Sequence, residues 1–265
     1  MKFSVNIEPL YEELDFCDRI PLIKEAGYDS IEFWSWADKD VGKIKETCEK
    51  YEVSISGFKG DQDYSLCDGE HTQEFIDSIK QSIETAKYLD CDSLIIHSNH
   101  FEESGSSDFR DKYSDAAHIA NMTHTLTLLA PILEENDIRM FIEPLNNLGA
   151  DGGMYLVDTE TTADIIRAVN SPNILLLADI YHVAMMQGNL LNHLADTLDI
   201  MSYVHVADAP DRQEPGTGEI CYEVLLKKLL EKGFDGTICY ELWPTTMENA
   251  LASMENLRKS LETAD

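Results

Sequence analysis

Four residues of types that commonly bind metal ions stand near the ends of four consecutive apolar runs. They are Glu143 in MFIEPLN, Asp179 in ILLLADIYH, His205 in SYVHVAD and Glu241 in TICYEL. A carboxylate at the end of a strand often only caps a helix, so none of the four is decisive by itself. Three carboxylates that converge in a closed site need a cation, because desolvating unpaired carboxylates is costly. If the runs are neighbouring strands, these residues predict a metal site.

The donor types narrow the choice of metal. Two glutamates, one aspartate and one histidine suit Mn²⁺, Mg²⁺ or Co²⁺ better than a structural zinc ion, which prefers Cys and His. By ligand type, Mn²⁺ is the first choice. The phosphate-binding patterns G-x-x-x-x-G-K-[ST] and G-x-G-x-x-G are absent from the sequence, so no nucleotide cofactor is expected.

Further residues stand where they could contact a substrate. His182 could hydrogen-bond a substrate oxygen, and Arg212 could pair with a substrate anion or stabilise developing negative charge. The alternative for Arg212 is an ion pair within its own loop, with Asp208, Asp211 or Glu214. We expect Asp208 to orient Arg212 or His205. Other strand ends supply four more predicted substrate contacts: Asn6, Trp34, Lys59 and His97.

The elements that must position these residues alternate along the whole chain. Apolar runs predict strands at 2–7, 30–36, 53–58, 93–98, 138–145, 173–180, 202–208 and 236–242. Amphipathic stretches predict helices at 14–28, 38–52, 72–90, 109–136, 159–170, 187–198, 221–234 and 245–264. This α/β order, with no linker of distinct composition, predicts a single-domain (β/α)8 TIM barrel over residues 1–265. The alternative is an open doubly wound sheet, which usually carries a Gly-rich phosphate loop after its first strand.

Composition limits the partners. With 20 basic and 50 acidic residues the formal net charge is -30, which disfavours nucleic acid and anionic lipid. No apolar run approaches the length of a membrane span, and MKFSVNIEPL lacks the apolar core of a signal peptide. The six cysteines form no C-x-x-C pair, as is typical of a reducing cytoplasm. We expect a cytoplasmic protein with a small-molecule substrate, as a homodimer or homotetramer.

Five segments carry a family resemblance: EAGYDSIEFW (25–34), FIEPLN (141–146), LLLADIYHVAMMQGNL (175–190), HVADAPDRQEPGTGEICY (205–222) and GFDGTICYELWP (233–244). The chain resembles the xylose-isomerase-like sugar isomerases and epimerases, and within them the hydroxypyruvate isomerase group. The resemblance implies a divalent metal held at Glu143, Asp179, His205 and Glu241. It also implies that the two glutamates transfer protons and that His182 and Arg212 contact the substrate.

The expected reaction is an aldose–ketose type isomerisation of a small hydroxy-carbonyl compound, hydroxypyruvate, another 2-oxo acid or a free sugar, through a cis-enediolate. The catalytic pair would be Glu143 and Glu241. Epimerisation of a ketose at C3 is the nearest alternative, because it uses the same metal and glutamates. Two further alternatives are a metal-dependent endonuclease, which needs a basic groove, and a non-catalytic sugar-binding barrel, which leaves the metal ligands idle.

Overall fold

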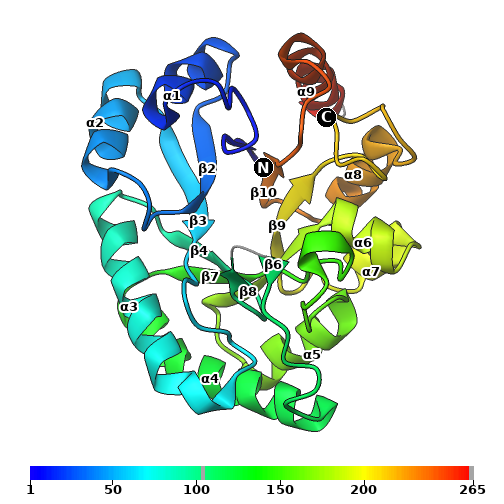
Figure 1. The fold of residues 1–265 in the computed structure, drawn as a ribbon. Coiled ribbons are helices and arrows are strands. Elements are labelled where there is room, and N and C mark those ends of the chain that lie inside the picture. The colour runs from blue at the N-terminus through cyan, green and yellow to red at the C-terminus, as the bar shows by residue number, and fades with distance from the viewer. Residues whose placement is uncertain (103–104, 263–265) are drawn as a thin grey trace.

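The strands of the chain close into a parallel barrel, as the sequence predicts. The computed structural model describes residues 1–102 and 105–262, and Figure 1 shows helices surrounding the strands. Within these residues, eight strands follow the order β1-β10-β9-β8-β7-β4-β3-β2. They are β1 (Lys2–Asn6), β2 (Ser30–Ser35), β3 (Ser54–Lys59), β4 (Ser93–Ile96), β7 (Arg139–Ile142), β8 (Ile174–Asp179), β9 (Met201–Val206) and β10 (Thr237–Tyr240). The fold is therefore a (β/α)8 TIM barrel that forms a single domain.

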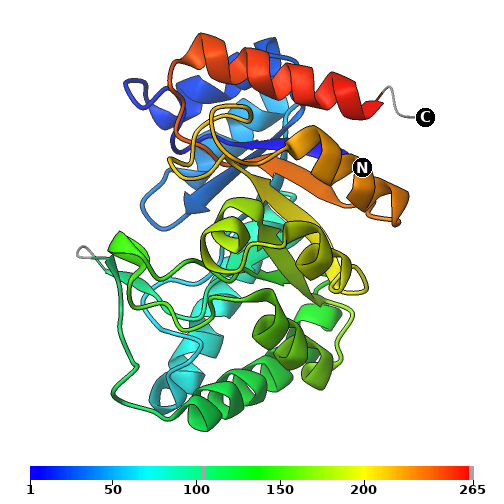
Figure 2. The same cartoon turned by 90° about the vertical axis from the view of Figure 1, so that its right-hand side faces the viewer.

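The helices pack their apolar faces against the outside of the barrel. They are α1 (Phe16–Glu25), α2 (Val41–Tyr51), α3 (Thr72–Tyr88), α4 (Asp115–Glu135), α5 (Thr159–Val169), α6 (Ile180–Met186), α7 (Leu190–Ala195), α8 (Tyr222–Glu231) and α9 (Met247–Glu262). The barrel closes where β1 pairs with β10. There α9, red in Figure 2, lies near the blue N-terminal segments, and Arg258 lies 5.5 Å from the ring centre of Tyr28.

The structure differs from the prediction in three places. The helix predicted at 109–136 begins only at Asp115, where the Ser114 hydroxyl caps it by accepting a hydrogen bond from the Ala117 amide. The helix predicted at 187–198 is the shorter α7, and the prediction missed α6, which Asp179 caps. The prediction also missed a short antiparallel pair of strands, β5 (Phe101–Glu102) with β6 (Gly105–Ser106).

The barrel interior is filled by a small apolar cluster from alternate residues of five strands: Ile95, Phe141, Leu177, Tyr203 and Cys239. Their neighbours in sequence, such as Leu94 and Ile96, belong to the larger core between strands and helices. This alternation is the two-residue period of a strand. Among the described residues, no helix is both long and apolar enough to cross a bilayer.

Candidate metal and substrate site

Strand periodicity brings the predicted metal ligands together. Each ligand follows a residue of the interior cluster by two positions, so its side chain points inward and lies nearer the C-terminal end of its strand. The pairs are Phe141 and Glu143, Leu177 and Asp179, Tyr203 and His205, and Cys239 and Glu241. The C-terminal face of a (β/α)8 barrel is where active sites of this fold lie.

The four residues, hereafter the metal quartet, form one buried group. One ligand atom from each of Glu143, Asp179, His205 and Glu241 lies within 4.8 Å of the others. The His205 Nδ1 atom lies 3.1 Å from a carboxylate oxygen of Glu143, 3.1 Å from one of Glu241 and 4.0 Å from one of Asp179. All four side chains are buried. The imidazole is therefore held among three carboxylates.

Arg212 reaches the same group from the loop after β9. Its Nη2 atom donates to Asp179 Oδ2 at 2.8 Å and to Glu241 Oε2 at 2.6 Å. The guanidinium lies near the aromatic rings of Tyr181 and Trp243. Its backbone has φ +56°, and its carbonyl oxygen accepts a hydrogen bond from the Trp243 amide. Arg212 thus pairs with two members of the quartet, and the alternative ion pair within its own loop does not form among the described residues.

The charges shift the pKa values of the quartet. Burial would lower the pKa of His205, but the carboxylates of Glu32, Glu143 and Glu241 outweigh it and raise that pKa. Burial opposes ionisation of Glu241, yet Arg212 and His205 hold its pKa at about 2. Burial raises the pKa of Asp179 to about 6, although Arg212 acts in the opposite direction. The three buried acids of the quartet are therefore neutralised by only two cationic groups, His205 and Arg212.

The quartet fits a divalent cation by geometry and by charge. Ligand oxygens lie about 2.0–2.2 Å from such ions, so donors on opposite sides of one ion are about 4 Å apart. The ligand atoms of the quartet lie within 4.8 Å of one another, so small side-chain rotations would bring them to these distances. A divalent ion would also supply the positive charge that Arg212 alone does not provide.

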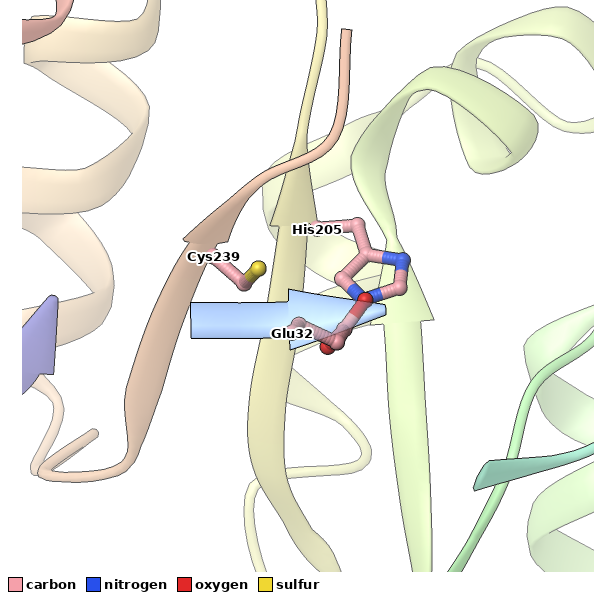
Figure 3. A group of neighbouring side chains, drawn as sticks. All are labelled: Glu32, His205 and Cys239. Carbon is pink, nitrogen blue, oxygen red and sulfur yellow. The ribbon is translucent and has the colours of Figure 1, made fainter. Parts of the chain in front are cut away.

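A second group of metal-binding residue types lies beneath the quartet. Figure 3 shows Glu32, His205 and Cys239 together in the barrel interior. Both Glu32 oxygens already accept hydrogen bonds, and burial raises the pKa of the Cys239 thiol well above its usual value. A metal ion would have to displace these donors and deprotonate the thiol. We therefore interpret this group as hydrogen-bonded support for His205.

A cavity of about 410 Å³ opens above the quartet. Four predicted substrate contacts line it: Trp34, Lys59, His97 and Arg212. The other two lie outside its lining. Asn6 is fully buried and donates to Glu32 and Glu241, at 2.8 and 3.1 Å. His182 is also buried, and its Nδ1 atom accepts from the Asn146 backbone amide at 3.0 Å.

The cavity includes residues to which the sequence analysis gave no role, among them Glu32, Asp151 and Trp243. Asp61, buried below His97, lies 3.3 Å from its Nδ1 atom and raises the pKa of that imidazole to about 9, although burial opposes this. Strand alternation could have identified Glu32, which precedes Trp34 by two positions. Trp243, and Asp151 in the short 3₁₀ helix Gly149–Asp151, carry no such signal.

Asp208 has a different role from the predicted one. Its carboxylate accepts hydrogen bonds from the backbone amides of Ala209, Gly216, Gly218 and Ile220, at 2.8–3.0 Å. The described contacts of this carboxylate include neither the Arg212 guanidinium nor the His205 ring. Asp208 therefore shapes the loop that carries Arg212.

A (β/α)8 barrel with an acidic, histidine-containing site at its C-terminal face defines the class of protein. The chain belongs to the xylose isomerase-like TIM barrel family, whose model matches residues 20–262. It is 28% identical over 267 residues to hydroxypyruvate isomerase of Escherichia coli (strain K12), covering 97% of this chain and 100% of that protein.

Two other proteins show the range of functions described for its relatives. The 2-oxo-tetronate isomerase of Haemophilus influenzae is 27% identical over 253 residues, covering 92% of this chain and 93% of that protein. A solved structure described as an AP endonuclease of family 2 from Brucella melitensis is similar with a TM-score of 0.87. It is 25% identical, covering 96% of this chain and 98% of that one.

Proposed function

We propose that this protein is a divalent-metal-dependent isomerase, with Mn²⁺ as the first choice of metal, that acts on a small hydroxy-carbonyl acid. The observation that carries the proposal is the metal quartet, in which two buried glutamates face one group of ligand atoms below a small cavity. The names of the two curated relatives support an isomerase.

The two glutamates are the proposed proton-transfer pair. One removes a proton from the carbon that bears the substrate hydroxyl, which leaves a cis-enediolate, and a proton is then returned to the neighbouring carbon. A bound divalent ion would polarise the carbonyl and stabilise the negative charge. Glu241 is held by donors from Trp34, Asn6 and Arg212. Glu143 lies 3.2 Å from His97 Nε2. Each base is thus oriented before the substrate arrives.

Lys59 favours a substrate that carries a carboxylate. The arginine and the other lysine that line the cavity are paired: Arg212 with the quartet, and Lys39 with Glu8 at 2.7 Å. Lys59 contacts the face of Phe101, at 4.7 Å, and has no ion pair within the described part of the chain. A substrate carboxylate would supply the missing partner. A phosphate would be expected to need two unpaired cations in the cavity, so an unphosphorylated acid fits the cavity better.

Solvent-deuterium exchange tests this proposal. With Mn²⁺ added, we expect NMR to show deuterium entering 2-oxo acids at the carbon next to the carbonyl. Glu143→Gln and Glu241→Gln should each slow exchange by about 10²–10⁴-fold. Full turnover by Glu241→Gln with metal bound would overturn the assignment. A C3 epimer formed from a free ketose would favour the epimerase. The absence of both metal binding and deuterium exchange would favour a binding protein.

Lys59→Met tests the substrate class separately. We expect its KM for an acid substrate to rise about 10–100-fold, because a hydrogen bond to a charged group contributes about 1.5–3 kcal/mol. Lys39→Met is the matched control, since Lys39 lines the same cavity but already pairs with Glu8. Equal effects of the two substitutions would contradict a specific role for Lys59.

Nucleic acid is not the proposed substrate. Six acids line the cavity, against three lysines and arginines: Glu8, Glu32, Asp38, Glu143, Asp151 and Glu241 against Lys39, Lys59 and Arg212. A phosphate backbone would be repelled by this lining and by the net charge of -30.

A further inference from the structure

Glu32 is a buried carboxylate that touches a predicted metal ligand without facing the metal position. It lies on β2, is 1% exposed, and both of its oxygens approach His205 Nε2, at 3.0 and 3.1 Å. Figure 3 shows the carboxylate beside the imidazole. The other ring nitrogen, Nδ1, faces Glu143 and Glu241. The two ring nitrogens of His205 therefore contact different carboxylates.

The hydrogen bonds of Glu32 fix the orientation of that ring. A carboxylate only accepts, so the Nε2 proton of His205 points at Glu32, and Nδ1, which faces the quartet, is the nitrogen at which a bound divalent ion would replace a proton. Glu32 Oε1 also accepts from Asn6 Nδ2 at 2.8 Å, and Glu32 Oε2 accepts from the Tyr203 hydroxyl at 2.5 Å. These donors occupy both oxygens, so Glu32 is poorly placed to become a metal ligand itself.

The same contacts connect Glu32 to a second ligand and to the barrel wall. Asn6 donates to Glu241 as well as to Glu32, so it links the two carboxylates. The Tyr203 hydroxyl is 2.9 Å from Ser56 Oγ, which lies 2.6 Å from Ser4 Oγ. Residues of three other strands, β1, β3 and β9, thus hold Glu32 in place. Carboxylates that orient a ligating histidine in this way affect metal affinity strongly.

We propose that Glu32 is the positioning residue that fixes His205 in its metal-binding orientation and thereby sets the affinity of the site. This inference rests on the proposed function, because it requires the quartet to bind a divalent ion. Removing the carboxylate leaves the quartet in place but frees its imidazole to rotate or to bind through the wrong nitrogen.

The test is a metal titration of the full chain after stripping with EDTA. For Glu32→Gln we expect Mn²⁺ affinity, measured by EPR, to fall about 10–100-fold. We also expect the visible absorption bands of bound Co²⁺ to shift. Asp68→Asn is the matched control, because Asp68 is another buried carboxylate, bonded to Tyr113 and Lys112 outside the cavity. It should bind Mn²⁺ as the wild type does.

Tyr203→Phe keeps the Glu32 carboxylate and removes one donor, so it should weaken Mn²⁺ binding by only about fivefold. If Glu32→Gln does not fold, this variant decides: unchanged affinity and an unchanged Co²⁺ spectrum would overturn the proposal. The same result for a folded Glu32→Gln would overturn it directly. A wild-type chain that binds neither ion would remove the proposed function as well, which distinguishes the two failures.

Discussion

The two glutamates of the metal quartet share a residue type and depth but differ in their hydrogen-bond partners. Glu241 Oε1 accepts from Trp34 Nε1 at 2.7 Å, and its other oxygen accepts from Arg212. Glu143 instead lies between the rings of His97 and His205. Donors such as an indole and a guanidinium do not give up their protons at neutral pH. Glu241 is therefore the more rigidly held of the two proposed bases.

Trp34→Phe isolates one of these donors. The substitution keeps an aromatic ring at the cavity but removes the indole N–H that orients Glu241. We expect kcat/KM for deuterium exchange to fall about 10–100-fold, since a hydrogen bond to a charged group contributes about 1.5–3 kcal/mol. Trp36→Phe is the control, because Trp36 Nε1 donates to Ser82 Oγ away from the cavity. Normal exchange by Trp34→Phe would show that Glu241 does not need this donor.

The element that brings Arg212 to the site is the loop between β9 and α8. Four of its backbone amides converge on the Asp208 carboxylate, and Gly218 approaches so closely that a Cβ atom there would lie 1.8 Å from the Ala209 carbonyl oxygen. Arg212 itself adopts a left-handed backbone, which costs a non-glycine residue about 1–2 kcal/mol. The loop therefore has to be rigid to hold Arg212 there.

Asp208→Ala should loosen this loop without touching the quartet. We expect faster hydrogen–deuterium exchange at the amides of residues 209–220 and a fall of tenfold or more, about 1.4 kcal/mol, in kcat/KM. Metal affinity should change less than turnover. Asp211→Ala is the matched control, because Asp211 is an exposed acid of the same loop. Slow amide exchange in Asp208→Ala would contradict the role assigned to this carboxylate.

At the scale of the secondary-structure elements, the sequence predicted those features that follow from the two-residue period of a strand. Phe141 and Glu143, or Tyr203 and His205, show the alternation directly in the sequence, so the barrel and the quartet could be inferred. Asp208 could not be assigned, because its partners are backbone amides whose positions depend on the folded loop. Asp151 likewise enters the cavity from a single 3₁₀ turn, Gly149–Asp151, which is too short for a sequence period to relate a residue to a direction.

On the scale of the whole molecule, the barrel interior divides into an apolar part and an acidic part. The apolar cluster stabilises the fold, whereas the buried carboxylates above it oppose folding unless positive charge compensates them. A net charge of -30 adds further repulsion in the compact state. Binding of a divalent ion at the quartet should therefore stabilise the entire chain.

Thermal unfolding measures this coupling. At a free Mn²⁺ concentration of 100 times Kd, binding adds about 2.7 kcal/mol, which for a chain of this size raises Tm by about 5–10 °C. EDTA should reverse the shift. Asp179→Asn should lose most of it, because that substitution removes a charged member of the quartet. NaCl at matched ionic strength separates the specific effect from screening of the surface charge. An equal Mn²⁺ shift in the wild type and in Asp179→Asn would place the stabilising ion elsewhere on the acidic surface.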